Sequence, residues 1–281
     1  MAAVATRPVL VRAACADAVR FERGAPDDDL GRHVAVIAQW STSPVLSRST
    51  SALVAGLQAG GYRVVVSSSC VASGPLVWGD DVDVDALVVV RKPNLGYDFG
   101  SWSVALGLLP QITHADRVII ANDSMAGPFT SLQPLLDRFE ATPADVWGLT
   151  DTQQFGPHLQ SYFLGFAGGV LASRPLREFF GGVRHETKKD DIIFRYEIGL
   201  GRLLHAEAFV QVPAFSHELL VEPGQNPVII GWLRLLDLGF PFLKREILRT
   251  PHVAPAGTTA PRVLHKRFGV DVDAWVSEGG G

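Results

Sequence analysis

Short apolar runs alternate with longer amphipathic segments along most of the chain. Four runs are rich in β-branched residues, which predicts strands buried on both faces: HVAVIAQW (33–40), YRVVVSS (62–68), ALVVV (86–90) and RVIIA (117–121). Between the first two, VLSRSTSALVAGLQAGG has apolar residues at helical spacing and ends on Gly-Gly, as a helix with a glycine cap does. Strand, helix and strand in this order predict a parallel sheet with right-handed crossovers.

The second half of the chain predicts further strands and helices. SLQPLLDRFE and DIIFRYEIGLGRLLHAE have helical spacing, and DVWGLTD and AEAFVQV are typical of strands. LQSYFLGFAGGVLAS predicts one or two strands, antiparallel and at an edge of the sheet. The apolar segment from about residue 226 predicts a helix, a Gly-Phe-Pro break and a short basic helix.

These elements predict an α/β fold in a single domain over residues 31–250. We expect a mainly parallel central sheet flanked by helices, with an antiparallel edge and a C-terminal helical segment. Residues 1–30 mix Ala, Arg and an acidic run without periodicity, which predicts a flexible leader. Residues 251–281 are expected to be a tail.

Composition narrows the partners that such a domain can have. The 281 residues are 47% hydrophobic, enough for a substantial core, and the formal net charge of −4 provides no basic field for nucleic acid. Cys15 and Cys70 are the only cysteines, which is typical of a reducing cytosol and excludes a disulfide framework. The weakly polar stretch 162–172 is too short and too rich in glycine to span a bilayer. We expect a cytoplasmic protein with a small or neutral partner.

A polar cluster follows directly on the predicted strand RVIIA. Asn122, Asp123 and Ser124 lie where an open α/β sheet usually binds its ligand, at the carboxyl end of a strand. Asp123 could hold Mg²⁺ or Mn²⁺ against a diphosphate, because phosphate and water would supply the remaining ligands. Alternatively, Asp123 or Ser124 caps the next helix.

A second candidate, NLGYDFGSW (94–102), follows the strand ALVVV. Gly96 and Gly100 would let a ligand approach the backbone, and the following helix N-terminus would favour an anion. Asn94 and Asp98 could bind sugar or ribose hydroxyls. The alternative is a tight turn in which Asp98 caps the helix.

Two later segments add polar side chains to the candidates. His158 and Gln160 are two residues apart on a predicted strand and so share a face that could bind a sugar or a phosphate, although such a histidine is also often structural. Glu197 lies between apolar positions of a predicted helix, where a buried carboxylate needs a partner or a function. Otherwise it is an exposed glutamate near Arg195 or Arg202.

Together these segments resemble the rhamnan synthesis protein F family, glycosyltransferase-like proteins of bacterial polysaccharide assembly. The resemblance covers about residues 33–250 and rests on NLGYDFGSW, RVIIANDSMAGP, DVWGLTD followed by HLQSYF, the YE of FRYEIGL, and NPVIIGWLRLLDLGFPFLKREILR. It implies a GT-A-like fold. It also implies transfer of a sugar, such as rhamnose or another deoxyhexose, from a nucleotide-diphosphate donor to a growing cell-surface polysaccharide or lipid-linked glycan.

The resemblance also implies roles for the residues at the donor. It places Asn94 and Gly96 near the nucleotide and Asp98 beside the donor. Related GT-A enzymes carry an Asp-x-Asp pair at the end of the central strand, where this chain has Asn122, Asp123 and Ser124. This departure leaves the need for a divalent cation, Mg²⁺ or Mn²⁺, open.

At the acceptor, the resemblance makes Glu197 the general base of an inverting transfer. A carboxylate there would remove the proton of the acceptor hydroxyl as the sugar carbon is attacked from the opposite face. The same architecture places His158 and Gln160 on the acceptor or donor-phosphate side.

Other readings of the same residues stay open. Asp123 with Glu197 could be the two carboxylates of a glycoside hydrolase, and a single aspartate after the strand also suits a non-catalytic sugar-binding or scaffold protein.

At the C-terminal end, Lys244, Arg245 and Arg249 alternate with apolar residues on a predicted short helix. That helix could dock at the inner face of the cell membrane or simply pack on the core.

Overall fold

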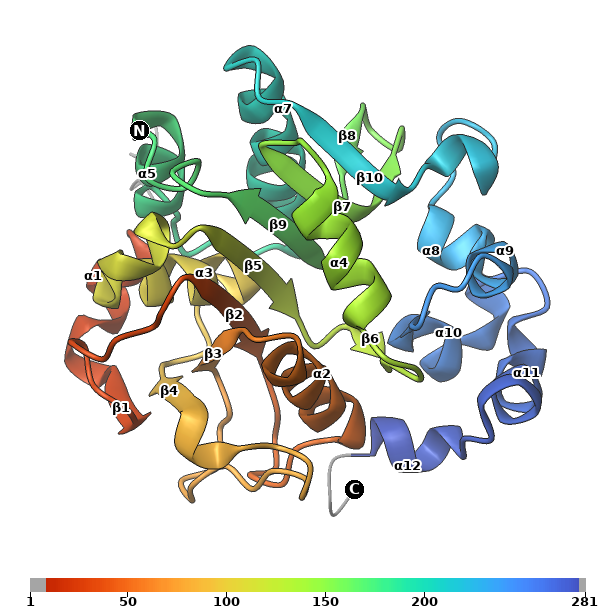
Figure 1. The fold of residues 1–281 in the computed structure, drawn as a ribbon, viewed down its shortest axis with the longest axis horizontal. Coiled ribbons are helices and arrows are strands. Elements are labelled where there is room, and N and C mark those ends of the chain that lie inside the picture. The colour runs from red at the N-terminus through yellow and green to blue at the C-terminus, as the bar shows by residue number, and fades with distance from the viewer. Residues whose placement is uncertain (1–8, 278–281) are drawn as a thin grey trace, which may run out of the picture.

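A nine-stranded mixed sheet lies at the centre of the computed structural model, which describes residues 9–277 (Figure 1). Eight strands follow the order β1 (Arg20–Arg23), β4 (Leu87–Arg91), β3 (Arg63–Ser68), β2 (His33–Gln39), β5 (Arg117–Asn122), β9 (Phe163–Ala167), β7 (Val146–Thr152) and β10 (Gln211–Phe215). The ninth, β8 (His158–Leu159), pairs with β7.

The four strands predicted from β-branched runs form the parallel core of the sheet. β2 pairs in parallel with β3 on one side and β5 on the other, and β3 pairs in parallel with β4. The predicted crossover helix is α2 (Arg48–Ala59), which begins after Ser47, whose side chain accepts a hydrogen bond from the Thr50 amide. The expected α/β class is therefore confirmed, with a mixed, mostly parallel sheet.

The antiparallel strand β9 lies inside the sheet rather than at its edge. It pairs antiparallel with both β5 and β7. Its first four residues, 163–166, are buried, so an apolar run of this kind needs neighbours on both sides and cover on both faces. The edge that is antiparallel is β1, which pairs with β4. The expected antiparallel pairing is thus present, but the place predicted for it from residues 159–173 is wrong.

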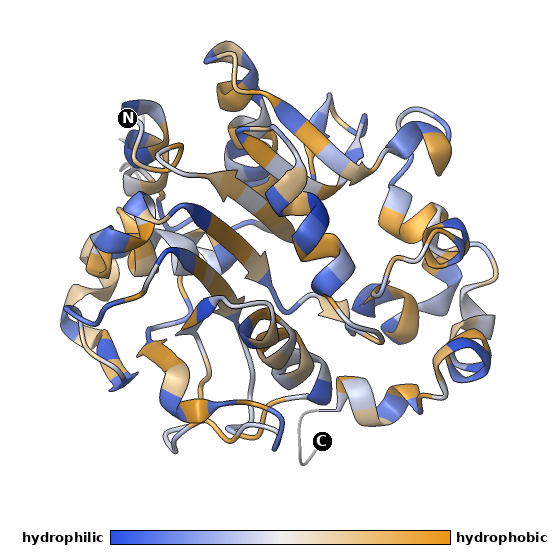
Figure 2. Cartoon of the chain, viewed as in Figure 1, coloured by the Kyte–Doolittle hydropathy of each residue, from blue (hydrophilic) through white to orange (hydrophobic). Residues whose placement is uncertain are grey.

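Helices cover both faces of the sheet (Figures 1 and 2). One apolar cluster joins the sheet to α1 (Val11–Cys15), α3 (Tyr97–Leu108), α5 (Arg174–Gly181) and α7 (Ile198–Ala206), with Trp102 fully buried at its centre. The other joins the opposite face to α2 and α4 (Gln133–Ala141), with Trp147 fully buried. The orange strands in Figure 2 are apolar because both of their faces are covered.

The N-terminal region belongs to this fold. Val11 and Cys15 of α1 are fully buried, and the edge strand β1 supplies Glu22, whose carboxylate pairs with buried Arg91 at 2.5 Å. A buried guanidinium requires such a partner, which explains why a glutamate lies at position 22 of β1. The flexible leader expected over residues 1–30 is therefore corrected for the described part, and residues 1–8 lie outside the described residues.

The C-terminal region is also folded. It contains α8 (Pro227–Ile230), α9 (Trp232–Asp237), β11 (Leu243–Lys244), α10 (Arg245–Arg249), α11 (Ala260–Phe268) and α12 (Val272–Val276). Leu264 and Trp275 are buried, and the Ser49 hydroxyl of α2 donates to the Trp275 carbonyl at 2.6 Å. The expected tail over 251–281 is corrected through residue 277, and residues 278–281 lie outside the description. The predicted basic helix is α10, which begins at Arg245. Lys244, which was expected on this helix, lies in β11 instead.

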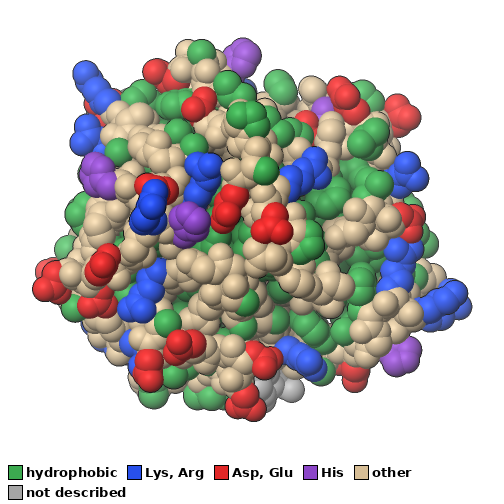
Figure 3. Space-filling model, in the orientation of Figure 1, with side chains coloured by type: hydrophobic (Ala, Val, Ile, Leu, Met, Phe, Trp, Pro, Cys, Tyr) green, Lys and Arg blue, Asp and Glu red, His purple; other side chains and the backbone are tan. Residues whose placement is uncertain are grey.

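Surface charge and helix length bear on the expected partners. On the face shown in Figure 3, acidic and basic side chains are interspersed rather than gathered into a field of one sign. Between residues 9 and 277, no helix combines the length and the apolarity needed to cross a membrane.

Candidate functional site

The candidate site lies where the sheet changes its direction of progression. From β2 the chain goes on to β3 and β4 on one side, whereas β5 adds to the other side of β2. The carboxyl ends of β2 and β5 meet at this point, and the Trp40 amide donates a hydrogen bond to Asp123 Oδ2 at 2.9 Å. Ligands of open α/β sheets bind in the crevice outside such a switch point.

Two cavities flank Trp40 at this end of the strands. The larger, of about 590 Å³, is lined on one side by the turn after β4, including Asn94, Gly96, Tyr97 and Asp98. The smaller, of about 310 Å³, is lined by Trp40, Asp123, Ser124, Lys244, Arg245, Glu246, Arg249 and Thr250. Trp40 is 44% exposed and Tyr97 is 46% exposed, so two aromatic residues are accessible beside the larger cavity. Sequence reasoning missed both.

Hydrogen bonds tie the polar cluster after β5 to its neighbours. Asn122 Nδ2 donates to Asp98 Oδ2 at 2.7 Å, and Asn122 Oδ1 accepts from the Ser124 amide at 3.1 Å. Lys244 Nζ donates to Ser124 Oγ at 2.9 Å. Neither Asp123 nor Ser124 caps the next helix, because α4 begins after Leu132 without a side-chain cap. The cluster instead joins three separate parts of the chain.

The carboxyl group of Asp98 is electrostatically coupled to this cluster. Its pKa is raised from 3.8 to about 7, chiefly by burial and next by the negative charge of Asp123, with a smaller contribution from Glu197. The positive charge of Lys244 and the hydrogen bond from Asn122 act in the opposite direction. Asp98 therefore supplies a second carboxyl group that is coupled to Asp123. It comes from the segment after β4, whereas both carboxylates of an Asp-x-Asp pair would follow β5.

Glu197 ends a π-helical segment, Ile193–Glu197, that joins α6 (Lys189–Ile192) to α7. Its Oε1 accepts hydrogen bonds from the Ser161 amide at 2.9 Å and the Ser161 hydroxyl at 3.0 Å. Arg195 pairs with Glu186 at 3.5 Å instead. Glu197 is thus held by Ser161 with one oxygen, in the kind of helical irregularity that often occurs at functional sites.

The backbone at Gly96 is shaped by packing. Gly96 has φ +78°, and a Cβ there would lie 2.6 Å from Val11 Cγ2 and 3.0 Å from Gly100 Cα. The helix α1 therefore packs closely against the turn that carries Gly96. Glycine at position 96 is explained by this contact, without a ligand.

His158 and Gln160 lie apart from the two cavities beside Trp40. His158 Nδ1 is 2.9 Å from the Gly156 carbonyl oxygen, and its side chain lines a different cavity of about 300 Å³ together with residues of α7. Buried Gln160 accepts from Thr150 Oγ1 at 2.8 Å and donates to Asn226 Oδ1 at 3.3 Å. Gln160 therefore links β7 to the C-terminal region, and its assignment to acceptor or phosphate stays a prediction.

Lys92 is a further buried cation near the larger cavity that the sequence reasoning missed. Its ammonium donates to Ser69 Oγ and to the Leu95 carbonyl, each at 3.0 Å. Burial lowers its pKa to about 8, against the opposing effects of Cys15 and Asp98. The sequence did offer one signal for Lys92, because this residue follows directly on β4, which ends at Arg91.

Asp98 and Asp123 are the side chains here that could hold a divalent cation. Magnesium is commonly bound through one or two carboxylates together with substrate phosphates. Over the described part of the chain, His, Cys, Asp and Glu side chains do not gather in groups of three or more that could hold a metal ion. A cation at Asp98 and Asp123 would therefore depend on phosphate oxygens from a ligand.

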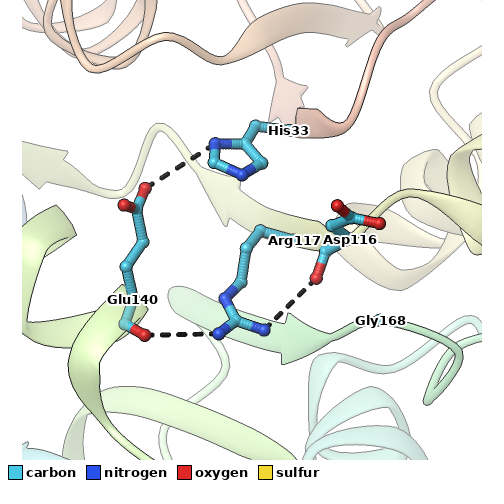
Figure 4. A pocket seen from close by; sticks show the side chains of 5 residues that line it. All are labelled: His33, Asp116, Arg117, Glu140 and Gly168. Carbon is cyan, nitrogen blue, oxygen red and sulfur yellow. Dashed lines mark hydrogen bonds and ion pairs between the residues drawn. The ribbon is translucent and has the colours of Figure 1, made fainter.

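A contrasting pocket lies at the opposite ends of β2 and β5 (Figure 4). His33 Nδ1 lies 3.6 Å from Glu140 Oε1, and Arg117 donates to the carbonyls of Glu140 and Asp116 at 3.2 Å and 3.3 Å. These polar groups are engaged with one another at the amino ends of the strands. The carboxyl end is the better candidate because it joins cavities to coupled charges.

Comparison with known proteins adds a family to this geometry. The profile of the Rhamnan synthesis protein F family matches residues 77–272. The chain belongs to the Rhamnan synthesis protein F family. The resemblance to this family that the sequence motifs indicated is confirmed. The matched range, 77–272, begins later and ends later than the expected range, 33–250. This family is implicated in rhamnan and polysaccharide synthesis.

The Rhamnan synthesis protein F match includes Asp98, Asp123, Glu197 and Lys244 but not β2 with Trp40. Two curated relatives are the Virulence protein VirA of Vibrio anguillarum (strain ATCC 68554 / 775) and the Virulence protein VirA of Vibrio anguillarum. Each is 28% identical over 194 residues, which cover 58% of this chain and 62% of the relative. The chain thus spans less than two thirds of these relatives.

Proposed function

We propose that the protein is a glycosyltransferase of polysaccharide synthesis that takes a sugar from a nucleotide-diphosphate donor, in a GT-A-like arrangement. The observation that carries the proposal is the switch-point crevice, where the ends of β2 and β5 meet beside two cavities and the coupled charges of Asp98, Asp123, Glu197 and Lys244. Family membership supports a role in polysaccharide synthesis.

The larger cavity suits the nucleoside half of the donor. Trp40 and Tyr97 expose aromatic rings on which a base can stack, and Asn94 offers an amide for ribose hydroxyls. Its volume of about 590 Å³ lies in the range of ordinary small-ligand sites. The smaller cavity, which shares Trp40, then receives the phosphates and the sugar.

Transfer requires a base for the acceptor hydroxyl. Glu197 is the proposed base: Ser161 holds its Oε1 through two hydrogen bonds, which leaves Oε2 to take the proton as the acceptor oxygen attacks the sugar carbon. The leaving nucleotide departs with the electrons of its bond to the sugar. Such a single displacement inverts the configuration at that carbon. A divalent cation at Asp98 and Asp123 would stabilise the negative charge on the leaving diphosphate.

Nucleotide release tests the proposal. Wild type and Asp123→Ala are incubated with dTDP-, UDP- and GDP-sugars, with and without manganese, and the released nucleotide is measured. We expect release from one donor, and its loss in Asp123→Ala. Absence of both release and binding for every donor in wild type would overturn the donor site.

A glycoside hydrolase is the second candidate, because the carboxylates of Asp123 and Glu197 both raise the pKa of the carboxyl group of Asp98. Hydrolysis of a simple glycoside without any nucleotide would favour that function. Tight sugar or nucleotide binding without turnover in the presence of acceptor glycans would instead favour a binding protein.

A further inference from the structure

A two-stranded ribbon brings the C-terminal region against the turn after β5. β11 pairs antiparallel with β6 (Met125–Ala126), which places Lys244 opposite Met125. The Arg245 amide then donates to the Ser124 carbonyl at 3.2 Å. In Figure 1 the ribbon lies between the sheet and the helices α8–α12. A segment more than a hundred residues away in sequence is thus fixed at the end of β5.

The ribbon presents Lys244 to the smaller cavity. Lys244 Nζ donates to Ser124 Oγ at 2.9 Å and lies 6.0 Å from the centroid of the Tyr162 ring. The ammonium carries a full positive charge and three N–H donors. Lys244 lines the same cavity as Asp123 and Trp40.

Arg245 anchors this arrangement from the interior. It is only 7% exposed, its Nε donates to the Met125 carbonyl at 3.2 Å, and its guanidinium donates to Ser47 Oγ at 2.6 Å. These bonds join the first residue of α10, directly after β11, to β6 and to the start of α2. They hold the ribbon in register and keep a positive charge in a poorly solvated position, where its field extends further than in water.

The charges around the smaller cavity suit a doubly charged anion better than a neutral sugar. Three cations line it, Lys244, Arg245 and Arg249, against the two carboxylates of Asp123 and Glu246. A phosphate placed beside Asp123 is repelled unless a positive charge lies between or next to them. Lys244 supplies that charge from the protein itself.

We propose that Lys244 binds the diphosphate of the donor directly and that Arg245 positions it through the ribbon. This inference rests on the proposed function, because it assigns the anionic part of the same donor to the cavity between Trp40 and Lys244. It also gives a different role to Lys244 and Arg245, which the sequence analysis placed on a short basic helix that could dock at a membrane or pack on the core. Contact with a membrane through Arg249 stays a prediction.

The test compares ligands that differ only in their phosphates. Affinities of dTDP, UDP and GDP, and of thymidine, uridine and guanosine, are measured by calorimetry for wild type and Lys244→Met, in EDTA and again with manganese. Losing one hydrogen bond to a charged group corresponds to about a tenfold to hundredfold weaker affinity. We expect that loss for the preferred nucleoside diphosphate and no change for its nucleoside.

Two further variants separate binding from general effects. Lys244→Arg keeps the positive charge and is expected to retain more diphosphate affinity than Lys244→Met. Lys266→Met removes the same charge from an exposed position on α11 and should change nothing. Unchanged diphosphate affinity in Lys244→Met, in both buffers, would overturn the inference while the proposed function stands. If wild type binds no nucleotide, the proposed function fails and the inference fails with it.

Discussion

Replacement of Asp98 by asparagine should stabilise the protein, and the gain should grow with pH. The carboxyl group of Asp98 carries a pKa raised to about 7 by burial and by Asp123, so its ionisation at neutral pH costs folding free energy. Asparagine keeps an oxygen that can accept the hydrogen bond from Asn122 Nδ2 and removes the charge. The substitution therefore isolates the cost of a buried carboxylate.

The sign and size of this effect follow from the two pKa values. Between the unfolded value of 3.8 and the folded value of about 7, the native state keeps a proton that the unfolded state has lost. Stability of the wild type therefore falls as pH rises through this window, and the full cost is present above it. Three pKa units correspond to about 4 kcal/mol as an upper limit. The part that develops between pH 5 and pH 8 is at most about 3 kcal/mol.

Urea denaturation at pH 5, 6, 7 and 8 measures the difference in unfolding free energy between Asp98→Asn and wild type. We expect the difference to rise in favour of the variant across this series. Asp81→Asn, which removes the same charge from an exposed loop, should give a flat difference. A flat difference for Asp98→Asn as well, or one that falls with pH, would refute the coupling of Asp98 to Asp123 and to burial.

Three further substitutions test separate parts of the account. Glu197→Gln should retain the contact with Ser161 and donor binding but lose about a hundredfold or more in transfer rate, as measured by product formation at saturating donor. Gly96→Ala should lower the unfolding free energy by about 1–3 kcal/mol in urea denaturation, because its methyl group would meet Val11 at a backbone conformation that alanine disfavours. His158→Ala should leave donor affinity within about twofold by calorimetry, since His158 lies outside the donor cavities.

For each of these three predictions, one result would contradict it. Normal transfer by Glu197→Gln would remove Glu197 from the role of base. A Gly96→Ala variant as stable as wild type would mean that α1 can move away from the turn. A large loss of donor affinity in His158→Ala would place His158 at the donor, which is one of the two positions that the sequence suggested.

The sequence predicted the parallel core because its signal is local. β2, β3, β4 and β5 are runs of β-branched residues, and such runs need only their own composition to be recognised as buried strands. β1 was missed because RFER is short and charged, and it becomes a strand by pairing with the distant β4, where Glu22 also neutralises Arg91. The position of β9 between β5 and β7 likewise depends on pairing that residues 163–167 do not encode alone.

In the candidate site, too, the sequence predicted what depends on local patterns and missed what depends on contacts between distant segments. Asp98, Asp123 and Glu197 were selected from the chain because polar residues after strands and inside apolar helices are locally unusual. Their mutual coupling, and the arrival of Lys244 through β6 and β11, depend on contacts between distant segments. The local pattern of basic and apolar residues therefore assigned Lys244 to a short helix, whereas the structure has it in β11.

A crystal structure with the preferred nucleoside diphosphate tests the central claim most directly. The account predicts the base beside Trp40 and Tyr97 in the larger cavity, with the phosphates reaching Lys244 past Asp123. A nucleotide bound at the opposite ends of β2 and β5, in the pocket of His33 and Glu140, would contradict it.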